Sequence, residues 1–387
     1  MNNFRFCVGT DILFGKNQLV NLPEAMKQYG KKVLLIYGGG SIKKTGLYDR
    51  ILSVLEGFEI HELSGVEPNP RVETVRKGVA LCRELGIEVL LPVGGGSTID
   101  CAKAIAAATF YEGDAWDMVL NAANGAIGKA LPICSVLTLS ATGSEMDPAA
   151  VISNAETNEK LPLVHPALLP KCSVLEPENT FTVPAHQTAA GSADIMSHVM
   201  EVYFGNEKTF VTDRICESLL KTVIHFAPVA MKDPENYEAR ANLMWASSLA
   251  INGLCNAGKA HDWSCHYIEH ELSAYYDITH GVGLAIVTPQ WMRYVLNDQT
   301  VDKFVDFAVN VWGIENTGDK FEVAKQGISA LEEFFKSLGI PMTLRDVNID
   351  ETHFAAMAKH AVQYTGIGKY AYVPLTEAQI VDILKMC

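Results

Sequence analysis

The chain has 387 residues, and its 45 Asp and Glu outnumber its 31 Lys and Arg, for a formal net charge of −14. Because nucleic-acid binding relies on clustered basic side chains, this acidic balance excludes a nucleic-acid partner from our expectations. The sequence also has no apolar run approaching the ~20 residues of a membrane span and no secretory signal pattern, so no membrane partner is expected. The length predicts about two or three domains, and the 48% content of hydrophobic residues fits packed globular ones.

The cysteines predict a reducing environment. Nine are spread along the whole chain, and no CxxC pair occurs. A disulfide framework is not expected in so long a chain, and thiols in apolar stretches behave as small hydrophobic groups. We therefore expect structural cysteines and a cytoplasmic protein.

The first half alternates between strand-like and helix-like segments. Hydrophobic runs predict strands at 32–37, 58–63, 88–93 and 131–139, and helical patterns predict helices at 45–56, 72–85 and 98–108. The opening segment 4–14 is also compatible with a hairpin on the sheet edge. Strand, glycine turn and helix in repetition are typical of a mostly parallel sheet covered by helices.

The second half changes character at Pro184. From there apolar residues recur at three- and four-residue steps. Helices are predicted at 185–203, 212–226, 237–253, 261–276, 289–294 and onward, 301–311, 321–338 and 351–364. The sequence thus predicts an α/β dinucleotide-binding domain at 1–183 and an all-helical metal-binding domain at 184–387, with the site in a cleft between them.

Two glycine-rich loops follow predicted strands. They consist of Gly38, Gly39, Gly40 and Ser41, and of Gly94, Gly95, Gly96 and Ser97. Glycines allow backbone N–H groups to approach an anion, and a helix N-terminus adds partial positive charge. Neither loop completes GxGxxG, and a tight turn without a ligand is the alternative for either one. Two such loops in one sheet favour phosphate or pyrophosphate binding.

A second cluster combines histidines with a carboxylate. Asp194 and His198 lie four residues apart on one helix face, as do His266 and His270, and His280 follows at a turn. Imidazoles and a carboxylate suit a borderline divalent cation. For Asp194 the alternative is a charge in the first turn of a helix. We interpret the remaining candidates as core, surface or helix-start residues: His225, His353, His360 and His261.

One short pattern points to a different chemistry. Residues 266–270 read HxxEH, in which metallopeptidases bind zinc through both histidines and activate water with the Glu. That chemistry explains neither the glycine loops nor the two-domain organisation. A zinc metallopeptidase therefore stays a remote alternative.

Taken together, the ordered motifs resemble the iron-containing (group III) alcohol dehydrogenase family, and most closely its NADP-dependent butanol dehydrogenase and broad-range aldehyde reductase branch. They span nearly the whole chain: 14–15, 38–46, 68–70, 94–100, 141–145, Lys160, 191–198 and 266–281. The resemblance implies a dehydroquinate synthase-like fold, with a Rossmann-like sheet domain before a helical domain, and a homodimer. Leu139, Ser140 and Asp147 depart from the family pattern, which leaves local cofactor contacts open.

The resemblance also implies a set of site residues. The metal, Fe²⁺ or Zn²⁺ among other candidates, is expected on Asp194, His198, His266 and His280. His270 is expected near the nicotinamide as a proton relay. The expected cofactor contacts are Gly38, Gly39, Gly40, Ser41, Asn69, Gly95, Gly96, Ser97, Asp100, Thr138, Thr142 and Lys160.

The implied activity is metal-dependent alcohol dehydrogenase or aldehyde reductase chemistry on substrates such as butanol and butyraldehyde. NAD-preferring relatives carry a carboxylate about where Gly38 stands, and this would repel a 2′-phosphate. With Lys43 nearby, NADP(H) is therefore expected over NAD(H). The alternatives are a dehydroquinate synthase-like or glycerol dehydrogenase-type enzyme, or a non-catalytic nucleotide sensor.

Overall fold

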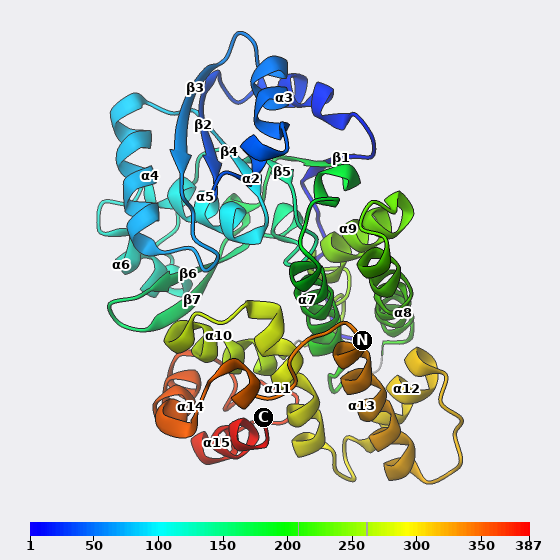
Figure 1. Ribbon diagram of the computed structural model, residues 1–387. Coiled ribbons are helices and arrows are strands. Elements are labelled where there is room, and N and C mark those ends of the chain that lie inside the picture. Colours follow the sequence, from blue (N-terminus) through cyan, green and yellow to red (C-terminus); the bar gives the residue numbers. More distant parts are fainter. Residues whose placement is uncertain (208, 261) are drawn as a thin grey trace. The chain divides into compact units, whose positions relative to one another are not determined.

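The computed structural model describes residues 1–207, 209–260 and 262–387. The chain forms two compact units (Figure 1). One comprises 7–183 and 234–252 and contains the sheet, and the other comprises 1–6, 184–233 and 253–387 and is helical. The predicted fold class, α/β followed by all-α, is confirmed. Helix α9 (Tyr237–Ile251) groups with the sheet-bearing unit, although it follows Pro184 in the chain.

The sheet has six strands in the order β1-β8-β5-β4-β2-β3, and every neighbouring pair is parallel. The strands are β1 (Asp11–Phe14), β2 (Lys32–Tyr37), β3 (Glu59–Ser64), β4 (Val89–Gly94), β5 (Cys134–Leu137) and β8 (Cys172–Leu175). The helices of this unit, besides α9, are α1 (Leu22–Met26), α2 (Ser41–Lys44), α3 (Leu47–Val54), α4 (Val72–Leu85), α5 (Gly96–Ala108) and α6 (Ala115–Leu120).

Both faces of the sheet are covered, which explains the continuous hydrophobic runs of its central strands. Leu34 and Ile36 of β2 belong to the core that also contains residues of α4, α5 and α6. Val33 and Leu35, which point to the opposite face, join residues of α1 and α3. Alternate residues of one strand therefore stabilise two separate cores.

The sheet-bearing unit differs from the sequence-based elements in several places. The opening segment forms no hairpin among the described residues, because β1 is a single edge strand parallel to β8. Within the predicted helix at 45–56 only α3 forms, and it begins at Leu47, because Gly46 adopts φ 76° between α3 and the short helix α2 that precedes it. An antiparallel hairpin, β6 (Ala149–Asn154) and β7 (Glu159–Val164), was not predicted, and neither was β8.

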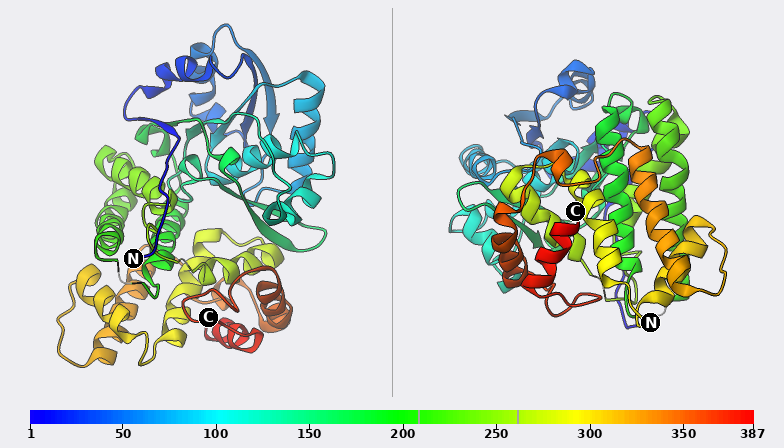
Figure 2. Two further views of the ribbon diagram at one scale, coloured as in Figure 1. Left: turned by 180° about the vertical axis from the view of Figure 1, so that it is seen from behind. Right: turned by 60° about the horizontal axis from the view of Figure 1, so that its bottom comes forward.

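The helical unit is built around α7 (Ala185–Tyr203), which packs along α8 (Phe210–Lys232) and α11 (His280–Val295) (Figure 2). From Thr188 to Tyr203 every residue of α7 is buried, as expected of a helix surrounded by others. The unit also contains α10 (Ser264–Tyr276), α12 (Val301–Trp312), α13 (Lys320–Ser337), α14 (Phe354–Tyr364) and α15 (Glu377–Met386).

Helix α11 begins nine residues before the predicted segment at 289, and α15 was not predicted. The early start of α11 depends on Gly281. A Cβ added there would lie 2.0 Å from the backbone oxygen of Ala190, so α11 and α7 touch backbone to backbone. The predicted helix start at His261 lies outside the described residues.

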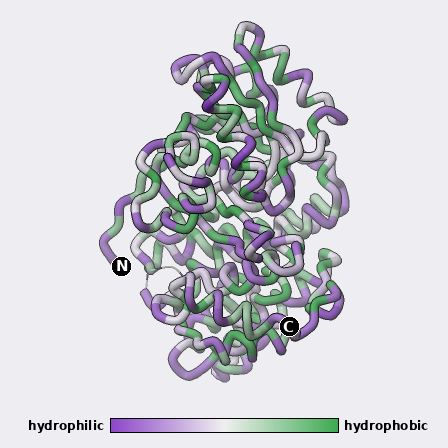
Figure 3. The backbone as a smooth tube through the Cα atoms, turned by 90° about the vertical axis from the view of Figure 1, so that its left-hand side faces the viewer, coloured by the Kyte–Doolittle hydropathy of each residue, from purple (hydrophilic) through white to green (hydrophobic). Residues whose placement is uncertain are grey.

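Hydrophilic and hydrophobic stretches alternate along the backbone (Figure 3). Among the described helices, none is both long enough and apolar enough to cross a membrane.

Candidate metal centre and nucleotide-binding edge

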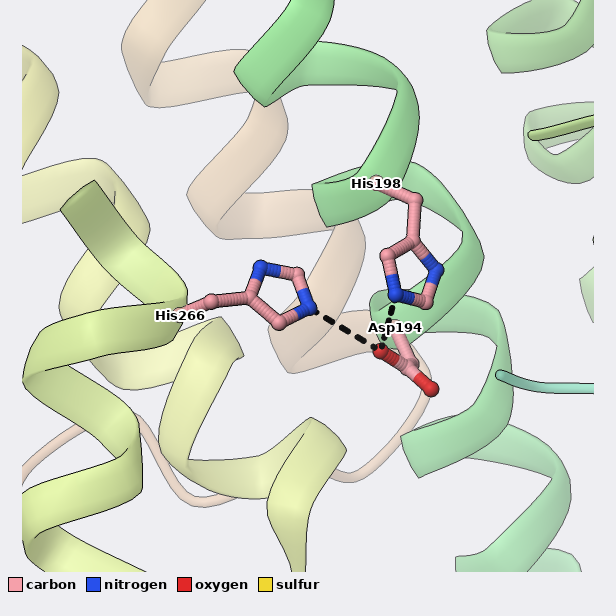
Figure 4. A group of neighbouring side chains, drawn as sticks. All are labelled: Asp194, His198 and His266. Atoms are coloured by element: carbon pink, nitrogen blue, oxygen red, sulfur yellow. Dashed lines mark ion pairs between the residues drawn. The ribbon is translucent and has the colours of Figure 1, made fainter. Parts of the chain in front are cut away.

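Three helices bring the predicted metal ligands together. Helix α7 places Asp194 and His198 one turn apart, α10 contributes His266, and His280 is the first residue of α11. Asp194 Oδ1 lies 3.6 Å from Nε2 of His198 and 3.7 Å from Nε2 of both His266 and His280. Figure 4 shows the rings of His198 and His266 pointing at Asp194 Oδ1. Three imidazole nitrogens therefore converge on one carboxylate oxygen.

The donor atoms fit a divalent cation. Asp194 Oδ1 and His266 Nε2 are buried and have no hydrogen-bond partner among the described residues, an arrangement that costs free energy unless a ligand satisfies them. Separations of 3.6 to 3.7 Å are too long for hydrogen bonds. They suit atoms that share one metal ion at about 2.0–2.2 Å each.

The electrostatics of the cluster favour a cation at the same point. Burial lowers the pKa of His198 to about 3 despite the attraction of Asp194, so this imidazole is neutral at pH 7. Burial alone would raise the pKa of Asp194, but the histidines, His198 first, hold it well below its usual value. Burial opposes the charged form of His266, yet Glu201 and then Asp194 raise its pKa to about 10. Without metal, a proton is therefore held between two carboxylates.

Two glutamates that were not among the predicted site residues lie behind the ligand rings. His266 Nδ1 contacts Glu201 Oε1, and His280 Nδ1 contacts Glu269 Oε2. Two sets of three residues place potential ligand atoms within 4.8 Å of one another: Asp194, His198 and His266 form one, and Glu269, His270 and His280 form the other. However, Glu269 faces the opposite nitrogen of His280 from the one that faces Asp194.

The other histidines have separate surroundings. His270 is buried beside the cluster, with its ring centroid 6.2 Å from that of His266 and 5.6 Å from that of His280. Its role as a proton relay stays a prediction. His360 pairs with Glu271, and the rings of His353 and His225 lie against Tyr275 and Phe226.

The glycine loops lie at one edge of the sheet. The loop at 38–41 follows β2 and the loop at 95–97 follows β4, and these strands are parallel neighbours. From β2 the chain moves to β3 on one side and then to β4 on the other. In doubly wound sheets, nucleotides bind outside the carboxyl ends of the strands where the order reverses in this way. The topology thus places both loops at the expected nucleotide position.

The two loops use glycine for different reasons. A Cβ added at Gly39 or Gly40 would meet no atom within 4 Å, and Gly40 adopts φ 94°, so this loop is open and tightly turned. A Cβ at Gly96 would lie 2.2 Å from Thr142 Oγ1. The second loop is therefore packed closely on the 138–142 segment, and α5 begins there with the free N–H groups of a helix N-terminus.

Several predicted cofactor residues make contacts within the protein. Asp100 accepts hydrogen bonds from the Ser144 hydroxyl at 2.6 Å and from the Val151 amide at 2.9 Å. The Ser97 hydroxyl contacts the backbone oxygen of Pro68. The Thr138 amide donates a hydrogen bond to the Gly94 carbonyl, and the Thr142 hydroxyl accepts one from the Ser144 amide. Asn69 and Lys160 are buried. Their roles toward a cofactor stay predictions.

Asp147, the departure from the family pattern, has a structural partner. It lies 2.6 Å from Nζ of Lys103, a fully buried lysine that also donates to Ser144 at 2.8 Å. The sequence offered no signal for Lys103, which reads as one more residue of an Ala-rich helix.

Family models match both halves of the chain. Residues 9–177 match the iron-containing alcohol dehydrogenase model, and residues 188–387 match the C-terminal model of the Fe-containing alcohol dehydrogenase family. This chain belongs to the iron-containing alcohol dehydrogenase family. It is therefore an oxidoreductase, and the metallopeptidase alternative is set aside.

Individual relatives agree with the family. The chain is 54% identical to NADH-dependent butanol dehydrogenase B of Clostridium acetobutylicum, with 100% of this chain and 99% of the relative covered. It is 40% identical to the NADPH-dependent aldehyde reductase YqhD of Escherichia coli, over 93% and 92%. Its fold matches the crystal structure of an NADH-dependent butanol dehydrogenase A from Thermotoga maritima with a TM-score of 0.95 and 40% identity, covering 100% and 98%.

Membership of the iron-containing alcohol dehydrogenase family implies a divalent metal and a nicotinamide cofactor. The relatives' names divide between NADH and NADPH, so they leave the coenzyme preference open.

Proposed function

We propose that the chain catalyses reversible hydride transfer between a nicotinamide coenzyme and a primary alcohol or aldehyde, such as butanol or butyraldehyde. The convergence of three imidazole Nε2 atoms on Asp194 Oδ1 carries this proposal. The relatives named as butanol dehydrogenases and aldehyde reductases support the substrate class.

The proposed division of labour follows from the donor set. When bound, a divalent cation, Fe²⁺ or Zn²⁺, polarises the substrate oxygen, and the nicotinamide exchanges the hydride. Asp194 with His198, His266 and His280 would hold the cation through one negative and three neutral ligands. A cation held there would attract the negative charge that develops on the substrate oxygen, and burial would strengthen that attraction. His270, beside the ligands, is proposed to exchange the alcohol proton with solvent.

The surroundings of the ligands favour a small uncharged substrate. The Trp263 ring lies edge-on at 5.1 Å from His266 and 6.0 Å from His198, measured between centroids. An anionic sugar phosphate, as in dehydroquinate synthase-like relatives, requires basic partners, and the ligand-bearing stretches 191–198 and 262–282 contain no Lys or Arg.

For the coenzyme we propose NADP(H). The open 38–41 loop carries no carboxylate and offers N–H groups and the Ser41 hydroxyl, with Lys43 close by. Two observations point the other way: Glu62 lies 3.4 Å from Nζ of Lys43, and the 54% identical relatives are named NADH-dependent. Because a charged hydrogen bond contributes about 1.5–3 kcal/mol, kcat/KM for NADPH should exceed that for NADH at least about tenfold. An equal or higher value for NADH would reject NADP(H).

The deciding assay is coenzyme oxidation with butyraldehyde, comparing metal-loaded protein with a sample stripped by a chelator. We expect turnover only in the loaded sample, while nucleotide binding survives stripping. Turnover that persists without metal would contradict the proposal. A non-catalytic sensor would bind nucleotide and reduce no aldehyde of two to eight carbons. We also propose a homodimer, which light scattering would detect at twice the 42.2 kDa chain mass.

A further inference from the structure

Two of the three ligand histidines have a buried glutamate behind them, and the third does not. His266 and His280 direct Nε2 toward Asp194 and Nδ1 toward Glu201 and Glu269, respectively. His198 also directs Nε2 toward Asp194, but its buried Nδ1 has no hydrogen-bond partner among the described residues. The outer sides of the three rings are therefore not equivalent.

Glu269 is built into its position from two helices. Its side chain is fully buried on α10, where one oxygen accepts a hydrogen bond from the Ser273 hydroxyl and the other contacts His280 Nδ1. Helix α11 has a glycine where it passes this side chain. A Cβ at Gly283 would lie 2.7 Å from Cγ of Glu269 and 3.0 Å from its Oε1.

Glu201 serves more than the ring that it contacts. Besides His266 Nδ1, it accepts hydrogen bonds from the Ser197 hydroxyl at 3.0 Å and from the backbone amides of Cys265 and His266 at 3.0 and 3.3 Å. It therefore also anchors the first turn of α10. Replacing Glu201 would disturb that turn together with the histidine, so Glu269 is the better residue to test.

We propose that Glu269 and Glu201 are positioning residues that set the metal affinity of the site, acting through His280 and His266. A neutral imidazole carries one proton, and it binds metal only through the other nitrogen. A carboxylate at Nδ1 keeps the proton there, orients the ring and leaves the Nε2 lone pair directed at the cation. Glu269 of the HxxEH pattern is thus assigned to holding His280 and not to activating water.

This inference rests on the proposed metal site, and the same experiment tests the two separately. Zn²⁺ affinity is measured by chelator competition on the full chain, for wild type, Glu269→Gln and Glu269→Ala. Removing a carboxylate that hydrogen-bonds to a ligating histidine typically weakens metal binding about 10–100-fold, and we expect a loss of this size for Glu269→Ala. Glu269→Gln should lose less, because its amide oxygen still accepts a hydrogen bond from His280 Nδ1.

The chain contains a matched control on the same helix. Glu271 is also buried on α10 and also pairs with a histidine Nδ1, that of His360 at 2.7 Å, but His360 is not a ligand. Glu271→Gln should leave Zn²⁺ affinity within about twofold of wild type, a change far smaller than the loss expected for Glu269→Ala. The absorption spectrum of the Co²⁺-loaded protein should change in the Glu269 variants and not in Glu271→Gln.

A further variant covers the case in which the Glu269 replacements do not fold. Gly283→Ala keeps the carboxylate and pushes it away from His280, so Zn²⁺ affinity should fall here too. If wild type binds no metal, the proposed function itself fails. If wild type binds and the Glu269 and Gly283 variants bind equally well, or if Glu271→Gln loses as much, the positioning role is overturned.

Discussion

Glu145 provides a quantitative test of the packing in the sheet-bearing unit. Its side chain is fully buried; Oε1 accepts a hydrogen bond from Ser248 on α9, and Oε2 has no hydrogen-bond partner among the described residues. Burial raises the pKa of Glu145 to about 7, although the Ser248 hydrogen bond opposes the shift. At pH 8 the folded protein therefore contains a buried carboxylate with incomplete compensation.

The sign and size of the effect follow from proton linkage. In the unfolded chain the same carboxyl group titrates near 4.5, so between about pH 4.5 and 7 the folded state binds more protons. Stability contributed by this group is present below that window and is lost as the pH rises through it. With 1.36 kcal/mol for each pKa unit, the loss is about 3 kcal/mol.

Glu145→Gln removes the titration and keeps the side-chain shape. Urea unfolding at pH 5 and pH 8 should show that the free energy of unfolding of the variant rises by about 2.5 kcal/mol relative to wild type between the two pH values, with little difference at pH 5. Parallel stability profiles for the two proteins would refute the reasoning, because they would mean that Glu145 is not buried in its charged form.

Three further perturbations test other parts of the structure. Gly281→Ala places a Cβ against the backbone of Ala190, so α11 should shift and carry His280 with it. The midpoint temperature of thermal unfolding and the metal content measured by mass spectrometry should then both fall. Asp147→Asn removes the carboxylate that pairs directly with the buried Lys103 and should lower the free energy of unfolding by about 3 kcal/mol in denaturant titrations; an unchanged value would contradict the buried pair. Asp194→Asn should release the metal, seen by equilibrium dialysis, while coenzyme fluorescence titration stays near wild type; retained metal would contradict its role as a ligand.

The sequence predicts those elements whose burial requires a recognisable pattern of hydrophobic residues. After their first residues, the runs KVLLIY and EVLLPV are continuously hydrophobic because both faces of β2 and β4 are covered. Strands β5 and β8 both read CSVL, but β5 lies within the longer apolar run 131–139, whereas Lys171 and Glu176 flank β8, so only β5 could be predicted. The start of α11 reads HGVG, which disfavours a helix locally, and only the contact of Gly281 with Ala190 explains it.

The same contrast holds for the candidate site. The spacing of Asp194 and His198 on one helix marks a shared face, so the ligands could be proposed from the sequence. Glu201 could not, because a glutamate in a helix usually faces solvent, and only the packing of α7 against α10 shows that it is buried. The role of Asp100 toward the cofactor stays a prediction, and the hydrogen bonds that its oxygens accept from Ser144 and Val151 could not be foreseen, because they depend on the tertiary fold.

The most direct test of the account is to locate the metal by anomalous X-ray diffraction from crystals of the metal-loaded protein. We predict a single peak within about 2.0–2.2 Å of Asp194 Oδ1 and of Nε2 of His198, His266 and His280. A peak bound instead between Glu269 and His270, or no peak near Asp194, would contradict the central claim that these four side chains form the metal centre.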